Sequence, residues 1–297
     1  HMASPELQML IDAKRADPYR PDKSIEELRG AHAAAGAAIP FPEGTTYAIV
    51  DANGVNAEWV EAPGASRDRT FMFIHGGGYY RGSAAGSRAT AAHISGAAGA
   101  RVFSIDYGLA PENPFPAAVD DALCAYQWML DQGVDPKRTA VGGVSAGGGL
   151  TLALLLKLKE IGAPLPAAAV PMSAWVDMKQ SGESFVTKAD VDPVICKIYL
   201  DRMAKAYLNG ADPETPLASP LYGDLSGLPP LLLQVGTAET LMDDSRMFAQ
   251  RATAAGVDVT LEPWEDMIHG WHGSPHILPE AREAIASLGV FFKRVVG

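Results

Sequence analysis

The sequence predicts an α/β protein in which a mostly parallel sheet carries helices on both faces. From Thr45 onward, short apolar runs typical of strands alternate with longer stretches of helical periodicity. The first two runs, Thr45–Val50 and Asn56–Val60, are joined by Asn53-Gly54, a dipeptide typical of the tight turn of an antiparallel hairpin. The remaining strands are expected to be parallel, because the helices between them supply the crossovers that parallel pairing needs.

We expect eight strands in all. After the hairpin, the predicted strands lie near Phe71–Ile74, Arg101–Asp106, Thr139–Gly143, Ala167–Met172, Leu231–Gly236 and Thr260–Trp264. The predicted helices between them lie near Ser87–Gly99, Ala117–Gly133, Gly147–Ile161, Met242–Gly256 and Pro279–Val295.

Two segments depart from this alternation. In the N-terminal segment, residues 1–44, the stretch from about Pro5 to Ile39 shows helical periodicity, with Leu7, Leu10 and Ile11 on one face, and contains no strand pattern. Residues 181–210 interrupt the alternation between two strands and are predicted to be a helical insertion. We therefore expect a core made of residues 45–180 and 211–297, with the other two segments forming a helical cap.

The stretch Gly143-Val144-Ser145-Ala146-Gly147 has the form Gly-x-Ser-x-Gly and lies between an apolar strand and a buried helix. This strand–turn–helix context is what a nucleophile elbow requires. The turn leaves space only for small residues two positions on either side of the serine, which explains the glycines at 143 and 147. The pattern predicts Ser145 as a nucleophile.

A second glycine-rich stretch, His75-Gly76-Gly77-Gly78, follows the predicted strand ending at Ile74. Consecutive glycines let backbone N–H groups approach a developing oxyanion without obstruction by side chains. We expect His75 to stabilise this loop through a hydrogen bond. Together the two stretches indicate a serine hydrolase.

A serine nucleophile needs a base and an acid, which follow it along the chain in α/β hydrolases. Of the seven histidines, His269 is the best placed, in the loop after the strand Thr260–Trp264. His272 is the alternative base, although both it and His276 are also consistent with solvated loop residues.

Three carboxylates compete for the role of the acid, in the loop after the strand Leu231–Gly236. Glu239 is nearest to the strand end. Asp243 and Asp244 suit the start of the next helix, where negative charge is favoured. Glu239 is therefore the preferred acid, with Asp243 as its rival.

These motifs resemble those of the hormone-sensitive-lipase-like microbial esterases, an α/β-hydrolase family. The likeness covers residues 75–269 and includes, besides the two glycine-containing motifs, Asp106–Glu112, Phe115–Ala118, Asp135–Arg138 and Ser219–Leu221. It implies an eight-stranded α/β-hydrolase sheet with a helical cap.

The resemblance also implies roles for individual residues. By this resemblance, Ser145 is the nucleophile, His269 the base and Glu239 the acid. The oxyanion-hole donors are the backbone N–H groups of Gly77, Gly78 and Ala146. Four residues are candidates for the substrate pocket, with plain packing as the alternative for the aromatic ones: Tyr79, Tyr80, Val144 and Trp175.

The sequence departs from the family pattern at two positions. Val144 stands where the family often has Asp or Thr, and Gly108 stands where it has an arginine. The nearby Glu112 is expected to be a buried structural carboxylate.

The predicted reaction is hydrolysis of short-chain carboxylic esters through an acyl-enzyme, without a metal or organic cofactor. Activity is expected to fall below about pH 6–7, where a free imidazole gains its proton. Lipase, lactonase or amidase activity on the same residues is the enzymatic alternative. A non-catalytic small-molecule receptor is the alternative from another class.

Bulk properties agree with a soluble enzyme acting on small molecules. The net charge of −11 argues against a nucleic-acid partner, and the longest apolar run is too short to span a bilayer. His1-Met2 looks like a remnant of cloning, and the following residues show no export signal, so a cytoplasmic location is expected.

Cys124 and Cys196 are expected to be core thiols. A homodimer is plausible through Thr260–Trp264 or Ile285–Val295.

Overall fold

The protein is described by a computed structural model over residues 4–297, so His1-Met2 and Ala3 of the predicted N-terminal segment lie outside the described residues. Its sheet has eight strands in the order β1-β2-β4-β3-β5-β6-β7-β8. They are β1 (Thr46–Ala52), β2 (Val55–Glu61), β3 (Ser66–Ile74), β4 (Ala100–Ile105), β5 (Thr139–Val144), β6 (Ala168–Met172), β7 (Leu231–Gly236) and β8 (Val259–Trp264). The predicted strand count is confirmed.

The sheet is mostly parallel, as the alternation of elements predicts. Only the β1–β2 and β2–β4 pairs are antiparallel, and Asn53 and Gly54 both have positive φ in the turn of the hairpin. The other pairs, from β4 through β3 to β8, are parallel. β8 is an edge strand, and its pairing in a homodimer stays a prediction.

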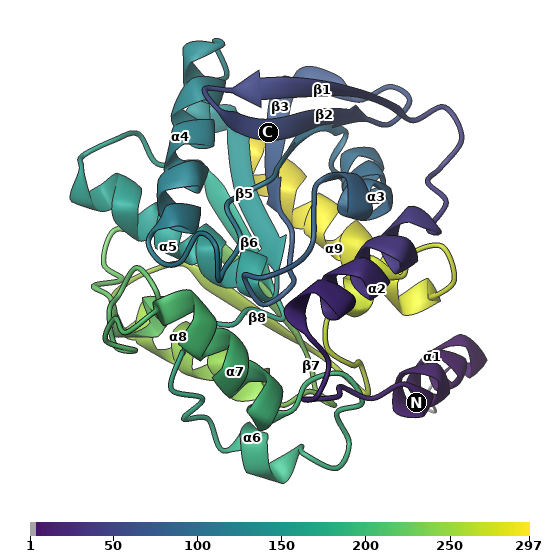
Figure 1. Ribbon diagram of the computed structural model, residues 1–297. Helices are drawn as coiled ribbons and strands as arrows, with labels where there is room; N and C mark the ends of the chain where they lie inside the picture. Colours follow the sequence, from purple (N-terminus) through teal and green to yellow (C-terminus); the bar gives the residue numbers. More distant parts are fainter. Residues whose placement is uncertain (1–3) are drawn as a thin grey trace.

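The helices are α1 (Pro5–Ala16), α2 (Ile25–Ala37), α3 (Arg88–Ala98), α4 (Ala117–Asp131), α5 (Ala146–Glu160), α6 (Ser184–Thr187), α7 (Lys197–Leu208), α8 (Met242–Ala254) and α9 (Pro279–Val296). Figure 1 shows the larger ones on both faces of the sheet. α3 and α9 contribute to the core on one face, and α4, α5 and α8 contribute to the core on the other.

β3 illustrates why the central strands are apolar throughout. Phe71 and Phe73 pack into the core shared with α3 and α9, whereas Met72 and Ile74 pack into the core shared with α4 and α5. Successive side chains of a strand point to opposite faces, so a strand covered on both faces needs an apolar residue at every position.

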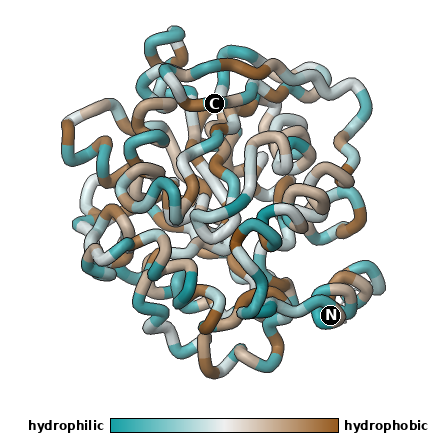
Figure 2. The backbone as a smooth tube through the Cα atoms, in the orientation of Figure 1, coloured by the Kyte–Doolittle hydropathy of each residue, from teal (hydrophilic) through white to brown (hydrophobic). Residues whose placement is uncertain are grey.

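The helices of the N-terminal and 181–210 segments pack around the layers on the sheet (Figure 1), and Leu28 of α2 and Tyr207 of α7 belong to the same core cluster as α4 and α5. α1 alternates between hydrophilic and hydrophobic stretches in Figure 2 and buries Leu7 against a cluster that includes Ile268 and Trp271. α2 begins with a capping box, in which Ser24 and Glu27 each bind the other's backbone N–H group. Within residues 4–297, no helix combines the length and the apolar character needed to cross a membrane.

Candidate active site

Ser145 lies at the junction between β5 and α5, in a backbone conformation that side chains rarely adopt. Its φ is 58° and its ψ is −120°, and such a conformation costs about 1–3 kcal/mol. Two hydrogen bonds hold it: the Ser145 N–H donates to the Met172 carbonyl at 2.9 Å, and the Ser145 carbonyl accepts from the Trp175 N–H at 3.0 Å. The surrounding sheet therefore imposes the turn that presents the serine hydroxyl.

The glycines on either side of Ser145 are required by close backbone contacts. A Cβ atom on Gly147 would collide with the carbonyl oxygens of Ile74 and His75, and one on Gly143 would collide with the carbonyls of Gly147 and Ile74. The elbow is packed directly against the end of β3, from which the second glycine-rich loop departs.

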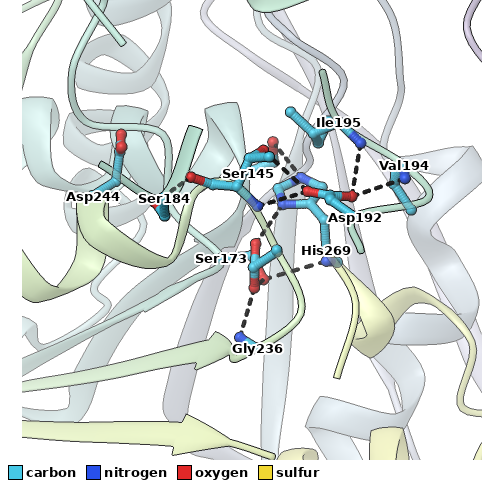
Figure 3. Close-up of polar contacts among 12 residues, drawn as sticks. Ser145, Ser173, Ser184, Asp192, Val194, Ile195, Gly236, Asp244 and His269 are labelled. Carbon is cyan, nitrogen blue, oxygen red and sulfur yellow. Dashed lines mark hydrogen bonds and ion pairs between the residues drawn. The ribbon is translucent and has the colours of Figure 1, made fainter. Parts of the chain in front are cut away.

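A continuous line of hydrogen bonds joins Ser145, His269 and Glu239. The Ser145 Oγ lies 2.9 Å from Nε2 of His269, and Nδ1 of the same ring lies 2.7 Å from Oε2 of Glu239 (Figure 3). The three residues come from the elbow, from the loop after β8 and from the loop after β7. This geometry has the hydrogen-bond pattern of a nucleophile, a base and an orienting acid.

The Glu239 carboxylate is fully buried and receives two further hydrogen bonds at its other oxygen. Its Oε1 accepts from the Gly236 N–H at 2.6 Å and from the Ser173 hydroxyl at 2.8 Å. The Ser173 Oγ in turn accepts from the Gly270 N–H at 3.2 Å, which links Glu239 to the loop that holds His269. Ser173 was missed in the sequence analysis; its position directly after β6, the neighbour of the nucleophile strand, is the only signal for it.

The rival acids have other partners. The Asp243 carboxylate accepts a 2.8 Å hydrogen bond from the Ser184 N–H and so connects α8 to α6. The Asp244 carboxylate is buried and accepts from the N–H groups of Val176 and Asp177. Burial raises the pKa of Asp244 well above its usual range, and these two hydrogen bonds oppose the shift.

The glycine-rich loop turns back on itself beside Ser145. Gly77 and Gly78 both have positive φ, and the Gly77 carbonyl accepts from the N–H groups of Tyr80 and Arg81 at 3.1 Å. A Cβ atom on Gly77 would collide with the Arg81 carbonyl, so this turn needs glycine. Ala146 is the first residue of α5, where backbone N–H groups have no partner within the helix and favour negative charge.

Ser145 and His269 open into a cavity of about 290 Å³. Its walls combine the glycine-rich loop with residues of α1, α2 and α7 and with the loop before α7. Of the four predicted pocket residues, Val144 contributes to this wall.

The three predicted aromatic pocket residues are fully buried and pack against other rings. Tyr79 stacks on Tyr207 at 3.8 Å and lies 6.0 Å from Trp175, and Tyr80 lies 6.1 Å from Tyr199. These contacts favour the packing interpretation for Tyr79, Tyr80 and Trp175.

Asp192, in the loop before α7, is a second residue that the sequence analysis missed. Its carboxylate accepts from the N–H groups of Val194 and Ile195, at 2.8 and 2.9 Å, and from the N–H and hydroxyl of Thr240, at 2.7 and 3.0 Å (Figure 3). It thereby ties two residues of the cavity wall to the neighbour of Glu239. No local pattern in the sequence distinguishes it.

Three expectations for other residues were wrong. His272 is buried rather than solvated, bonds to Gln234 at 2.9 Å, and has its pKa lowered to about 3 by burial. Glu112 is exposed rather than buried, and it forms an ion pair with Arg29 of α2. Cys196 is exposed, directly before α7, whereas Cys124 on α4 is partly buried and packs against the edge of the core.

The expectation for His75 is in line with its contacts. Its Nδ1 bonds to the Gly76 carbonyl at 2.7 Å, and its ring stacks on Tyr107, whose hydroxyl donates to the His75 carbonyl at 2.8 Å. The ring is thus part of the support beneath the glycine-rich loop.

Comparison with known proteins identifies the family. Residues 71–273 match the family of the alpha/beta hydrolase fold. An acetyl-hydrolase of Streptomyces hygroscopicus is 42% identical over 299 residues, covering 100% of this chain and 99% of that protein. A solved esterase of the bacterial hormone-sensitive lipase family is 48% identical, covers 100% of both chains and superimposes with a TM-score of 0.97. The chain belongs to the bacterial hormone-sensitive lipase family of α/β hydrolases.

Membership of this family makes the chain a hydrolase of the serine carboxylesterase class. Another structurally similar family member is the esterase EstE5, solved after a soak with p-nitrophenyl butyrate. It is 42% identical, covers 99% of each chain and has a TM-score of 0.95.

Proposed function

We propose that this hydrolase cleaves short-chain carboxylic esters through a triad of Ser145, His269 and Glu239 and an acyl-enzyme intermediate. The observation that carries the proposal is the pair of hydrogen bonds at 2.9 and 2.7 Å that joins the three side chains in the order nucleophile, base and acid.

In the acylation step, Ser145 Oγ attacks the ester carbonyl while His269 Nε2 takes the serine proton. His269 then gives that proton to the leaving alcohol as the tetrahedral intermediate collapses to the acyl-enzyme. In deacylation the same nitrogen activates a water molecule, which releases the acid and restores Ser145. Glu239 holds the ring with its proton on Nδ1, so that Nε2 is free to accept.

The negative charge on the tetrahedral oxygen needs donors that are already in position. The backbone N–H groups of Gly77, Gly78 and Ala146 are proposed for this role, which fits the glycine-lined wall beside Ser145. Loss of one such donor typically costs about 3–4 kcal/mol of transition-state stabilisation.

The size of the cavity supports small acyl groups. Its volume of about 290 Å³ is at the lower end of the range for ligand pockets, and α1, α2 and α7 contribute to its walls. We propose that residues 1–44 and 181–210 form a cap that limits acyl length. A close relative's name, acetyl-hydrolase, points the same way.

The test compares p-nitrophenyl butyrate with p-nitrophenyl palmitate for the wild type and for Ser145→Ala. We expect a kcat/KM for the four-carbon ester well above that for the sixteen-carbon ester, and no turnover above background in Ser145→Ala. Preference for palmitate would contradict the short-chain proposal. Residual activity in a folded Ser145→Ala protein would contradict the proposed nucleophile.

A further inference from the structure

Three basic side chains lie in the wall of the catalytic cavity. Lys14 comes from the last turn of α1, His32 from α2, and Arg81 follows the glycine-rich loop. The same three residues also line a second cavity of about 220 Å³, so the basic side chains stand where the two cavities meet. Arg20 and Lys23 extend the basic character into the second cavity.

This concentration of positive charge is not balanced locally. The whole chain has a net charge of −11, yet among residues 4–297 the wall of the catalytic cavity contains no aspartate or glutamate. Asp17 is the acidic member of the second cavity's wall, against several basic ones. A neutral ester in the catalytic cavity would therefore leave Arg81 and Lys14 with Asp17 of the second cavity as the acidic residue within the two walls.

Of the three basic side chains in the cavity wall, Arg81 has a buried nitrogen, Nε, that lacks a hydrogen-bond partner within the described part of the chain. Its guanidinium group lies 5.2 and 5.7 Å from the ring centres of Tyr80 and Tyr199, which fix its position. A buried donor left without a partner destabilises the site, and an oxygen anion that accepts from the Arg81 guanidinium would remove that cost.

The charge of Arg81 also affects the pKa values of Lys14 and His32. Lys14 and His32 are exposed residues that meet the cavity with part of the side chain. Desolvation of that part, and then the charge of Arg81, lower the pKa of Lys14, whereas the charge of Asp17 raises it. The same two causes lower the pKa of His32 to about 3, so its imidazole is a neutral hydrogen-bonding group near pH 7. An anion between these residues would relieve the repulsion between Arg81 and Lys14.

We propose that this basic wall is a subsite for a carboxylate that the substrate carries beyond its scissile ester bond. The inference rests on the proposed esterase function and narrows its substrate class to monoanionic esters. Arg81 can bind a carboxylate through two parallel N–H groups, and Lys14 adds a point charge. An uncharged ester of the same size lacks both interactions.

The experiment compares two matched pairs of substrates, measured as kcat/KM by proton release at pH 7.5. Monoethyl glutarate and its ω-amide place the charge difference on the acyl side. 3-Acetoxypropanoate and its amide place it on the alcohol side. We expect the wild type to favour the anionic member of one pair by about tenfold, which corresponds to about 1.4 kcal/mol. The pair that responds identifies the side on which the subsite lies.

The variants test whether the basic wall causes this preference. Arg81→Gln and Lys14→Gln should each lower the ratio between the anionic and the neutral ester by at least threefold, whereas Arg81→Lys should retain part of it. Using the ratio within each variant cancels any general loss of activity. Arg15→Gln is the matched control, because Arg15 is exposed on α1 like its neighbour Lys14 but lies outside both walls.

Two results would overturn the proposal: equal kcat/KM values within both pairs for the wild type, or an anionic preference that survives in both Arg81→Gln and Lys14→Gln. Calorimetric titration of Ser145→Ala with the anionic and the neutral member of the pair that responds gives a second measurement, independent of turnover, and should show tighter binding of the anionic member. Failure to hydrolyse p-nitrophenyl butyrate would instead contradict the esterase function itself. Hydrolysis of butyrate without any anionic preference would remove only the subsite.

Discussion

Replacing Glu239 by glutamine should inactivate the enzyme while leaving its shape almost unchanged. In the native site, Oε1 of Glu239 accepts from the Gly236 N–H, which can only donate. The amide oxygen of a glutamine must take this position, so its NH₂ group faces His269 Nδ1 in place of Oε2. The ring proton is then forced onto Nε2, where His269 can no longer accept the proton of Ser145.

The size of the effect follows from two contributions. Turning the amide the other way would leave the buried Gly236 N–H unpaired, at a cost of about 1–3 kcal/mol. The lost negative charge no longer stabilises the imidazolium, which is worth about 4 kcal/mol at an effective dielectric constant of about 20. Together they amount to about 5–7 kcal/mol, or about 10⁴ to 10⁵ in kcat.

The assay is kcat on p-nitrophenyl butyrate at pH 7.5, with Ser145→Ala as the baseline and circular dichroism as the check on folding. Asp243→Asn is the matched control: its carboxylate bonds to the Ser184 N–H, so we expect kcat within about threefold of the wild type. The reasoning is refuted if Glu239→Gln keeps more than a tenth of the wild-type kcat. A loss confined to Asp243→Asn would move the role of the acid to Asp243.

Three other variants test the surroundings of the site. Gly147→Ala should unfold the elbow region, because its Cβ would collide with the carbonyl of Ile74, and the soluble yield and thermal midpoint should both fall. Asp192→Ala should lower the free energy of unfolding in urea by about 2 kcal/mol and also reduce kcat, since the cavity loop loses its connection to Thr240. An unchanged midpoint would contradict that connection. Because burial raises the pKa of Asp244 in the folded state, its ionisation destabilises the fold as pH rises above the unfolded value of about 3.9. The stability of Asp244→Asn relative to the wild type should therefore improve from pH 5 to pH 8 in urea titrations, and a constant difference would contradict the shift.

The sheet could be predicted from the sequence because its cause is local. Each central strand is apolar at consecutive positions, as Phe71–Ile74 shows, and each is separated from the next by a helical stretch. The elbow could be predicted for the same reason, because its tight turn leaves no space for a side chain at positions 143 and 147 and therefore requires glycine there.

The residues that support the site could not be predicted, because their partners lie far away along the chain. The Ser173 hydroxyl meets Glu239 from 66 positions away, and the Asp192 carboxylate meets Thr240 from 48 positions away. His272 illustrates the opposite error. A histidine in a loop suggests solvent, but Gln234 on β7 supplies a buried partner that no local pattern reveals.

The residues that could be predicted are those proposed for the chemistry, and the residues that could not be predicted are those proposed to select the substrate. The proposed chemical groups stand on the ends of strands and on the tight loops that follow them, where backbone geometry constrains the residue types. The residues proposed to select the substrate come from α1, from α2 and from the segment after the glycine-rich loop. α1 is held through few positions, such as Leu7, which packs against the loop after β8 and against α9 and leaves few constraints on the rest of the helix. Lys14 and Arg81 share one cavity wall although they lie on different elements. Their charges become a recognition site only when α1 is docked beside the glycine-rich loop, so the specificity of this enzyme should depend on how firmly its N-terminal helices are held.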